Sequence, residues 1–525
     1  MLQPMPNTIH FGKNIISILT SGMYKDPEFL FREYIQNAAD QIDKDRGNDD
    51  SDESICIFLD KDNREIRIED KATGIPNKDV HRILGNIAAS EKVAGTDKGM
   101  FGIGRLGGLS YCDTLVFETS YRGENMASIM TWDAKKLLEN VGKGNNHLDA
   151  ATLISSVIST TTQAADPTSH YFKVILKNIP ERFSFLLDKE RIMNYLRMTA
   201  PVKVDERKFS DYGRVREFLR THGIAEPPTY RVFLNNEEVK KPYHTFTDAP
   251  VRTEKQKIKK IEKKIFTDDK GRIQAWAWVG IRDFSEGTSV IKQDCIFRAI
   301  RLRLHNIQIG GEDTLTSLYN EDKAAKYFVG EIHVIDTSLT PNARRDYFEL
   351  TPEFDLFQKQ VKDFLNKLFK QVRNDSNLSS VKKQIKTQEE ILASFQDKKN
   401  RGFIDKEEQE EWVNKKNKAE AERLKAIQKY QRLVPDDKTY PSSKTGEQIS
   451  TKLENENCGE RESQTNQEKK TKDRIPLITD NLHGYSRSET KIISKILKVI
   501  TKSLKNEPDK GEKLVKEIID TLKRK

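Results

Sequence analysis

The chain has 525 residues, of which 33% are charged and 36% apolar. This length exceeds what one ordinary hydrophobic core supports, so two or three globular units are expected. The sequence contains no run approaching the roughly 20 consecutive apolar residues of a membrane span, which excludes a transmembrane protein. The net charge of +9, from 90 Lys and Arg against 81 Asp and Glu, permits nucleic-acid contact. It is much weaker than the focused basic surface of a dedicated DNA-binding protein.

The first residues and the cysteines predict a reducing, cytoplasmic setting. The opening sequence MLQPMPNTIHFGKN has no basic region followed by an apolar block, which a secretory signal needs. The four cysteines lie far apart and form no CxxC pair, which argues against a disulfide framework or a structural zinc site. They are Cys56, Cys112, Cys295 and Cys458.

The first third of the chain mixes helical and strand patterns. Helical spacing of apolar residues marks 8–46, and Asp26-Pro27-Glu28 predicts a helix start with Asp26 as the cap. The alternating runs 54–60 and 64–70 flank a short turn and predict a hairpin. Further expected elements are a helix over about 77–90, a glycine-rich stretch at 95–108, strands at 114–120 and 170–179, and a helix at about 188–198. The pattern predicts an α+β fold: an α/β sandwich with helices over one face of a mostly antiparallel sheet, within a domain spanning residues 1–205.

A second, mixed α/β middle domain is expected over residues 206–375. Its predicted strands are YRVFLNN (230–236), IQAWAWVGI (273–281), AIRLRLHNIQIG (299–310) and YFVGEIHVID (327–336). A helix over about 353–373 is expected to close it.

The composition then changes to a helical C-terminal region. Residues 376–433 are rich in Lys, Glu and Gln and predict a helical pair or coiled coil. Residues 434–478 are polar and predict a disordered linker. Residues 479–525 predict two basic amphipathic helices. These could dock on the rest of the chain, pair with a second subunit or contact an acidic partner, and packing or pairing is the preferred interpretation.

Three polar residues recur on one face of the expected helix within 29–43. Glu33, Asn37 and Asp40 stand at i, i+4 and i+7. A carboxylate that activates water, an amide oxygen that binds magnesium and an acid behind them suit triphosphate hydrolysis. Taken alone, the same spacing is typical of a solvent-facing stripe.

Two later segments favour a nucleotide site over a solvent-facing stripe. Asp70 ends an expected strand before the turn Lys71-Ala72-Thr73-Gly74, where a carboxylate can accept a hydrogen bond from a base amine and a glycine allows close backbone approach. The stretch 98–108 is dense in glycine and can present backbone N–H groups to phosphate oxygens. No GxxxxGK[ST] sequence occurs, which excludes a P-loop, and a dinucleotide fold does not fit the position of the glycines.

The three segments together resemble the N-box and the two glycine boxes of the GHKL superfamily (Bergerat fold), which includes DNA gyrase B subunits, heat-shock chaperones, sensor histidine kinases and mismatch-repair ATPases. The similarity is strongest to the ninety-kilodalton heat-shock chaperones. It extends through LTSGMYKDPEFLFREYIQNAADQIDKDR (19–46), ILGNIAASEK (83–92) and GMFGIGRLGGLSYCDTLVFETS (99–120), and covers about residues 10–375.

The resemblance implies a role for each matching residue. Glu33 would be the general base, Asn37 the magnesium ligand, and Asp70 the acceptor of the adenine amine above Gly74. Asp40 would line the pocket. Gly99, Phe101, Gly102 and Gly104 would form the phosphate end of a lid, and Ile75, Lys98 and Ile103 complete the expected ATP-binding set.

The second domain adds a cation to this site. The segments from 299 to 350 resemble the chaperone middle domain, and Arg345 matches the loop arginine that reaches the γ-phosphate, with Arg344 as the neighbouring candidate. Two departures concern the adenine side. Ala72 replaces the first glycine of DxGxG, and the Gly-Thr pair expected in the late strand is absent from SHYFKVILKNI.

Three functions follow from the sequence. The first is a magnesium-dependent ATPase that acts as a conformational clamp, resembling a heat-shock chaperone, with an ATP-dependent homodimer and protein clients. The second is a clamp acting on DNA, favoured by the pI of about 9.0 and the basic C-terminal helices. The third is a nucleotide-binding scaffold without hydrolysis, against which the presence of both Glu33 and Asn37 argues.

Overall fold

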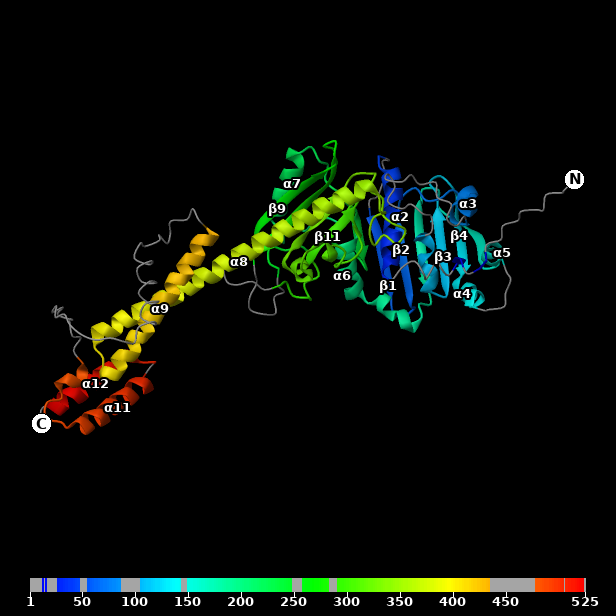
Figure 1. Ribbon diagram of the computed structural model, residues 1–525. Helices are drawn as coiled ribbons and strands as arrows, with labels where there is room; N and C mark the ends of the chain where they lie inside the picture. Colours follow the sequence, from blue (N-terminus) through cyan, green and yellow to red (C-terminus); the bar gives the residue numbers. More distant parts are fainter. Residues whose placement is uncertain are drawn as a thin grey trace. The chain divides into compact units, whose positions relative to one another are not determined.

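A computed structural model describes residues 12–13, 15–16, 26–47, 54–85, 104–142, 149–247, 257–282, 290–434, 477–504 and 506–523. The chain forms two compact units, one ending at Phe369 and the other comprising the helical region from Lys370 onward (Figure 1). Within the described ranges, no helix has the length and apolar character to cross a membrane. Among the described residues, Cys56, Cys112 and Cys295 form no disulfide.

The first unit begins with an eight-stranded sheet. Its strands run in the spatial order β5 (Ile158–Ala164), β4 (Met126–Asp133), β3 (Thr114–Ser120), β6 (Tyr171–Lys177), β2 (Glu65–Asp70), β1 (Ser54–Asp60), β7 (Arg231–Leu234) and β8 (Glu237–Glu238). Strands β1 and β7 are parallel, and every other neighbouring pair is antiparallel.

Helices cover one face of this sheet and bury its alternate apolar side chains. They are α2 (Phe29–Asp45), α3 (Val80–Gly85), α4 (Ala134–Gly142), α5 (Ala150–Ser155) and α6 (Lys189–Thr199), with 3₁₀ turns η1 (Asn77–Asp79), η2 (Gly104–Ser110) and η3 (Glu181–Leu187). The shared core takes Ile55 and Ile57 from β1, Ile66 and Ile68 from β2, and Leu30 from α2. The α/β sandwich with a mostly antiparallel sheet is therefore confirmed.

A second, five-stranded sheet lies in the same unit. Its order is β12 (Ile307–Ile309), β11 (Ala299–Leu304), β13 (Val329–Val334), β10 (Ile273–Arg282) and β9 (Ile258–Thr267). On one face α7 (Tyr212–Thr221) shares a core with Trp278, and on the other Phe266 of β9 contacts Phe357 of α8 (Pro352–Arg401). The turns η4 (Thr316–Leu318) and η5 (Asp322–Tyr327) connect β12 to β13.

The second unit is helical. The later part of α8 and α9 (Lys406–Leu433) pack as an antiparallel pair through Val381, Ile385 and Tyr430. After η6 (Ile478–Asn481), α11 (Arg487–Ser503) and α12 (Pro508–Lys523) bury Leu497 and Val515 against Ile404, between α8 and α9. Of the three options for the basic helices, the described contacts support docking on the chain itself.

Three expectations at the level of elements were wrong. The strand predicted for the middle domain at 230–236 is β7, which pairs with β1 of the first sheet, because the backbone of β1 offers it an edge there. The cap of α2 is Glu28 rather than Asp26, because Asp26 to Glu28 form a preceding turn whose carbonyls accept the first helical N–H groups. The helix expected to end near 373 continues to Arg401, since nothing between these residues breaks it.

Other expectations hold in part. The helix expected at about 77–90 begins as η1 and continues as α3 to Gly85. Almost all of the polar linker expected at 434–478 lies outside the described residues, and the coiled coil and the division at residues 205 and 375 stay predictions. The sequence did not predict strands β4 and β5 or helices α4 and α5.

Candidate functional site

Helix α2 brings the predicted polar stripe to the inside of the first unit. The side of α2 that carries Leu30 and Ala38 faces the core, and the helix is so enclosed that Glu33 is only 6% exposed and Asp40 3%. Asn37 between them is half-buried. A solvent-facing stripe, the alternative left open by the spacing, is therefore excluded for Glu33 and Asp40.

Glycine at position 104 makes room for the Glu33 carboxylate. Gly104 begins η2, and a Cβ atom at this position would collide with Glu33 Oε2. The turn is fixed to α2 from the other side, because Tyr34 Oη donates to the Arg105 carbonyl at 3.0 Å and accepts from the Gly108 N–H at 3.1 Å. The glycine-rich segment is thus held directly against the helix that carries the predicted base.

The loop that carries Arg344 and Arg345 reaches the same carboxylate. Arg345 Nε lies 4.0 Å from Glu33 Oε1, and the side chain of Arg345 is 7% exposed. Arg344 is exposed. The structure therefore brings Arg345, rather than Arg344, to Glu33.

Arg32 fastens this loop to α2. Its Nη1 donates to the Arg345 carbonyl and its Nη2 to the Arg344 carbonyl, each at 3.4 Å, and Nη2 also lies 3.4 Å from Glu33 Oε1. Arg345 adopts a left-handed φ of 54°, and its carbonyl accepts from the Gly310 N–H at 2.9 Å. The backbone of the arginine is thus held from two sides, which sets where its guanidinium can go.

Asp70 forms a separate polar corner at the end of β2. It is 3% exposed, and its Oδ1 accepts from the Ala72 N–H at 3.1 Å. Burial raises the pKa of Asp70 to about 7, with smaller contributions from the nearby Glu69 and Asp45. A buried carboxylate with a raised pKa gains from a ligand that donates hydrogen bonds to it.

The turn after Asp70 is tightly packed despite the substitution at position 72. Ala72 is not among the residues with positive φ, so its methyl group is tolerated, and its carbonyl bonds to His170 Nδ1 at 2.9 Å. Gly74 has φ of 71°, and a Cβ atom there would collide with the Ser120 carbonyl. Ile75 follows, and its N–H donates to Thr119 Oγ1 at 2.9 Å. The turn therefore keeps its shape without the first glycine of the motif.

The buried state of Asp70 predicts a pH-dependent loss of stability. Because its pKa is about 7 in the folded chain and 3.8 in the unfolded chain, the folded state binds an extra proton between these values. Stability from this group is present below pH 3.8 and is lost as the pH rises through 7, by on the order of 4 kcal/mol. Asp70→Asn should therefore exceed wild type in unfolding free energy at pH 8 and lose this advantage towards pH 4.

Urea unfolding of the ligand-free protein at both pH values measures this difference. Glu69→Gln, the neighbour on the opposite face of β2, is the control and should show a much smaller pH-dependent difference. An Asp70→Asn difference that is equal at the two pH values would refute the prediction.

The predicted residues thus fall into two described groups. Glu33, Gly104 and Arg345 meet at α2, and Asp70, Gly74 and Ile75 lie at the end of β2. Lys98, Gly99, Phe101, Gly102 and Ile103 lie outside the described residues. The sequence reading missed Arg32, Thr119 and His170. Only Arg32, which precedes Glu33 in the matching segment, carried a signal that could have singled it out.

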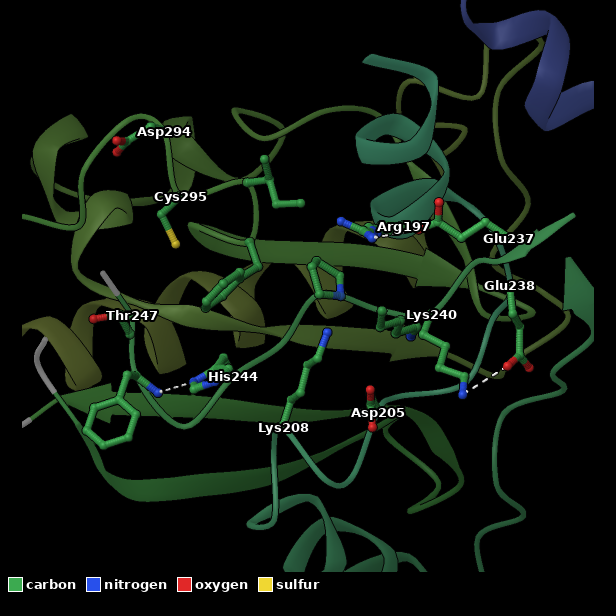
Figure 2. A pocket seen from close by; sticks show the side chains of 15 residues that line it. Arg197, Asp205, Lys208, Glu237, Glu238, Lys240, His244, Thr247, Asp294 and Cys295 are labelled. Carbon is green, nitrogen blue, oxygen red and sulfur yellow. Dashed lines mark hydrogen bonds and ion pairs between the residues drawn. The ribbon is translucent and has the colours of Figure 1, made fainter. Parts of the chain in front are cut away.

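One further cavity is lined by other residues. It has a volume of about 550 Å³ and lies beside the second sheet, with Arg197, Lys208, Lys240, His244 and Cys295 among its lining residues (Figure 2). It includes none of the residues predicted for the nucleotide site. Its charges are mixed, since Glu238 pairs with Lys240 at 2.9 Å and Glu237 with Arg197 at 3.7 Å.

Comparison with known families bears on the first sheet and its helices. Residues 28–165, which run from the start of α2 to just beyond β5, match the family described as "Histidine kinase-, DNA gyrase B-, and HSP90-like ATPase". The amino-terminal part is a GHKL-type ATPase domain. The expected resemblance and fold class are thereby confirmed, and α2, β2 and η2 are the elements of this GHKL domain that carry Glu33, Asp70 and Gly104.

Curated relatives with the printed name "Chaperone protein HtpG" match part of the chain. The protein of Coxiella burnetii (strain RSA 331) is 29% identical over 170 residues, which is 27% of each chain. That of Streptomyces coelicolor is 26% identical over 198 residues, 33% of this chain and 30% of the relative. That of Wigglesworthia glossinidia brevipalpis is 37% identical over 87 residues, 15% of this chain and 14% of the relative. The match thus spans less than a third of the length of these relatives.

Proposed function

We propose that the chain binds ATP in its GHKL domain and hydrolyses it with the help of Arg345. The observation that carries this proposal is the approach of Arg345 to within 4.0 Å of Glu33, two buried residues from distant parts of the chain. A carboxylate and a guanidinium that face each other beside a glycine turn suit a hydrolytic site: one activates water, and the other stabilises the phosphoryl charge.

Each residue of the proposed site has a distinct task. Glu33 accepts a proton from the attacking water, and burial against Gly104 limits the positions its carboxylate can take. Arg345 places positive charge beside the phosphoryl group that is transferred to water, as an arginine finger does. The GHKL domain supplies the first residue and the loop after β13 the second, so hydrolysis requires both.

Magnesium fits the donors on α2. Asn37, Glu33 and Asp40 present oxygen ligands along one helical stripe, and magnesium prefers a few such ligands together with substrate phosphates. We propose Asn37 as the ligand in this set. When bound there, the ion would neutralise phosphate charge, while Glu33 stays available for water.

We propose that Asp70 binds the adenine amine. The raised pKa of Asp70 reflects burial; the Ala72 N–H already donates to it, and an exocyclic amine would supply a further donor. The buried turn through Ala72 and Gly74 offers a rigid floor beside it, held by Thr119. Phe172 of β6 lies opposite Asp70 in the sheet.

We further propose a chaperone-like clamp that acts on protein clients in the cytoplasm as an ATP-dependent homodimer. This extends from the printed names of the relatives, which match a third of this chain or less. Those relatives are chaperones, so they lend no support to the alternative of a DNA clamp.

The proposal is tested by measuring ATP binding and hydrolysis by wild type and by Asp70→Asn. Loss of one charged hydrogen bond is expected to weaken ATP binding about 10- to 100-fold. Glu69→Gln is the matched control and should bind ATP like wild type. Equal ATP affinity in all three proteins, or no ATP binding by wild type, would refute the proposed site.

A further inference from the structure

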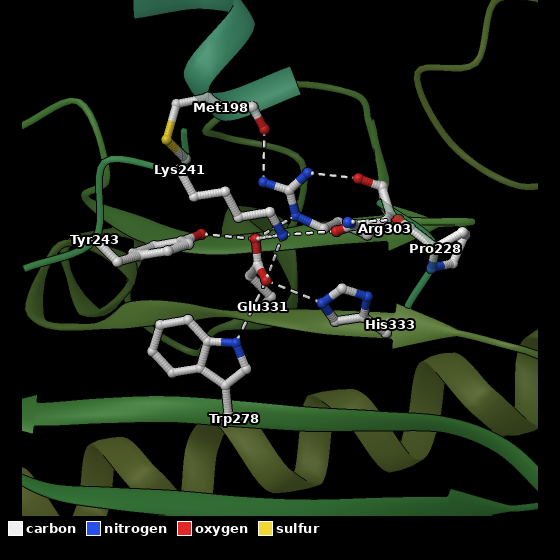
Figure 3. A network of polar contacts seen from close by, with 9 residues as sticks. Met198, Pro228, Lys241, Tyr243, Trp278, Arg303, Glu331 and His333 are labelled. Atoms are coloured by element: carbon white, nitrogen blue, oxygen red, sulfur yellow. Dashed lines mark hydrogen bonds and ion pairs between the residues drawn. The ribbon is translucent and has the colours of Figure 1, made fainter. Parts of the chain in front are cut away.

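A buried polar cluster lies in the second sheet, centred on Glu331 of β13 (Figure 3). Its carboxylate is fully buried and accepts from Lys241 Nζ at 2.8 and 2.9 Å and from His333 Nε2 at 2.9 Å. Tyr243 Oη donates to it at 3.0 Å, and Arg303 forms an ion pair with it. So many donors on one buried carboxylate specify a single arrangement of the segments that supply them.

The cluster has more N–H donors than its carboxylate can accept. Although burial alone would raise the pKa of Glu331, Arg303 and Lys241 hold it well below its ordinary value. Burial lowers the pKa of His333 to about 4, so its ring is neutral at pH 7. Burial and the neighbouring Arg303 lower the pKa of Lys241 to about 7, so only part of the Lys241 population is charged at pH 7. Arg303 and Lys241 bring more N–H donors than the carboxylate can accept, and the remaining donors bond to the Met198 carbonyl and to the side chain and carbonyl of Asn306.

Arg303 connects the cluster to the beginning of α2. Its Nη2 donates to the carbonyl of Met198, near the end of α6, at 2.6 Å. Near the other end of α6, Arg191 Nε donates to Glu28, the cap residue of α2, at 2.7 Å. Helix α6 is thus fixed at one end to the cluster and at the other to the helix that carries Glu33.

Asn306 connects the cluster to the other end of α2. Its Oδ1 accepts from Lys241 Nζ at 2.6 Å, and its Nδ2 donates to the Pro228 carbonyl at 2.9 Å. Two residues further along, Tyr230 Oη donates to Asp43 in the last turns of α2 at 2.7 Å. Both ends of α2 are therefore held by segments that bond to the same cluster.

The hairpin that carries Arg303 and Asn306 also supports the arginine loop. Strand β11 turns through His305 and Asn306, both with positive φ, into β12. Directly after β12, the Gly310 N–H donates to the Arg345 carbonyl at 2.9 Å. A Cβ atom at Gly310 would lie 2.5 Å from the Asp346 carbonyl, so the loop rests closely on this hairpin.

We propose that the cluster of Lys241, Arg303, Asn306 and Glu331 positions α2 and the Arg345 loop relative to each other. These are positioning residues, since they act through Glu33 and Arg345 rather than on a substrate. The effect on turnover rests on the proposed function, whereas the effect on the position of the loop does not. A displacement of about 1 Å between reacting groups can lower a rate by about 100-fold, so the cluster need move only slightly to matter.

Asn306→Asp tests the connection with little disturbance of the fold. Aspartate tolerates the left-handed φ of 64°, keeps an acceptor for Lys241 and adds a negative charge beside it. It loses the donor to the Pro228 carbonyl and places a carboxylate against it. Asn306→Gly removes both side-chain bonds and also suits the left-handed φ. His305→Asn, in the same turn but outside the cluster, is the matched control.

Both Asn306 variants should lower kcat by about 10- to 100-fold while ATP affinity stays within about 2-fold of wild type. In an Arg345→Ala background they should cause a smaller further loss than in wild type, because one of the two residues through which they act is gone. His305→Asn should match wild type. A kcat unchanged by either Asn306 variant, or a full additional loss in the Arg345→Ala background, would overturn the proposal.

Hydrogen exchange separates failure of this inference from failure of the proposed function. Amides of the loop 340–348 should exchange faster in both Asn306 variants than in His305→Asn, without ATP present. If wild type hydrolyses no ATP but the loop still exchanges faster, the ATPase proposal fails and the positioning role holds. If wild type hydrolyses ATP and the loop exchanges at the same rate in all variants, the positioning role fails alone.

Discussion

Glu33→Gln is expected to abolish ATP hydrolysis, with kcat reduced by about 100- to 10,000-fold, while ATP still binds. Glutamine has nearly the same size and shape, so it fits the space that Gly104 leaves beside the side chain. It cannot accept the proton of the attacking water. Single-turnover hydrolysis and equilibrium binding of ATP, measured on the same preparations, separate the loss of chemistry from the loss of binding.

Lys44→Gln serves as the control for this measurement. Lys44 is an exposed residue on the same helix, so its replacement alters the charge of α2 without reaching the site. It should hydrolyse ATP at the wild-type rate. Hydrolysis that persists in Glu33→Gln at the rate of wild type would show that another group activates water, and the role proposed for Glu33 would be withdrawn.

Much of the first sheet could be predicted from local sequence patterns. The hairpin of β1 and β2 was predictable because alternating burial and a turn lie within one short segment, and the structure gives both strands within a residue or so. Glu33 and Asp70 could be found because each belongs to a short segment that resembles a known motif. Their burial could not be read in the same way, since it depends on what covers α2 and the end of β2.

Contacts between segments far apart in the chain could not be predicted from the sequence. Strand β7 looks like part of the middle domain by its position in the chain, yet it pairs with β1 because an exposed strand edge is available there. The cluster around Glu331 gave no signal, because Lys241 and Arg303 are ordinary polar residues until three elements bring them together. The hydrogen bond from Arg32 to the Arg345 loop also joins distant segments, so it could not be predicted either.

The sequence match placed Arg345 at the arginine position of the loop and left Arg344 as the neighbouring candidate. A matching frame identifies the loop, but the choice between Arg344 and Arg345 depends on the backbone conformation. The left-handed φ of Arg345 turns its side chain inward, while Arg344 stays exposed. The conformation of the loop, held by the bonds from Arg32 and Gly310, therefore brings Arg345 to Glu33.

Replacement of these two arginines should consequently have very different effects. Arg345→Ala is expected to lower kcat by about 1,000-fold, the lower end of the range for an arginine finger, with ATP affinity reduced only slightly. Arg345→Lys should recover a small part of the rate, because an ammonium keeps the charge without the planar set of donors. Arg344→Ala should stay near wild type. Steady-state hydrolysis with ATP varied gives kcat and KM for each protein.

The backbone conformation at position 345 lets Arg345→Ala report on the loss of the guanidinium alone. Alanine at position 345 meets the same left-handed strain that arginine already bears, so Arg345→Ala removes the guanidinium without adding a new backbone cost. The carbonyl bonds from Arg32 and Gly310 do not involve the side chain and should survive in the variant. Equal rates for Arg345→Ala and wild type would mean that the 4.0 Å approach to Glu33 is a structural ion pair, and the cation for hydrolysis would have to come from another residue.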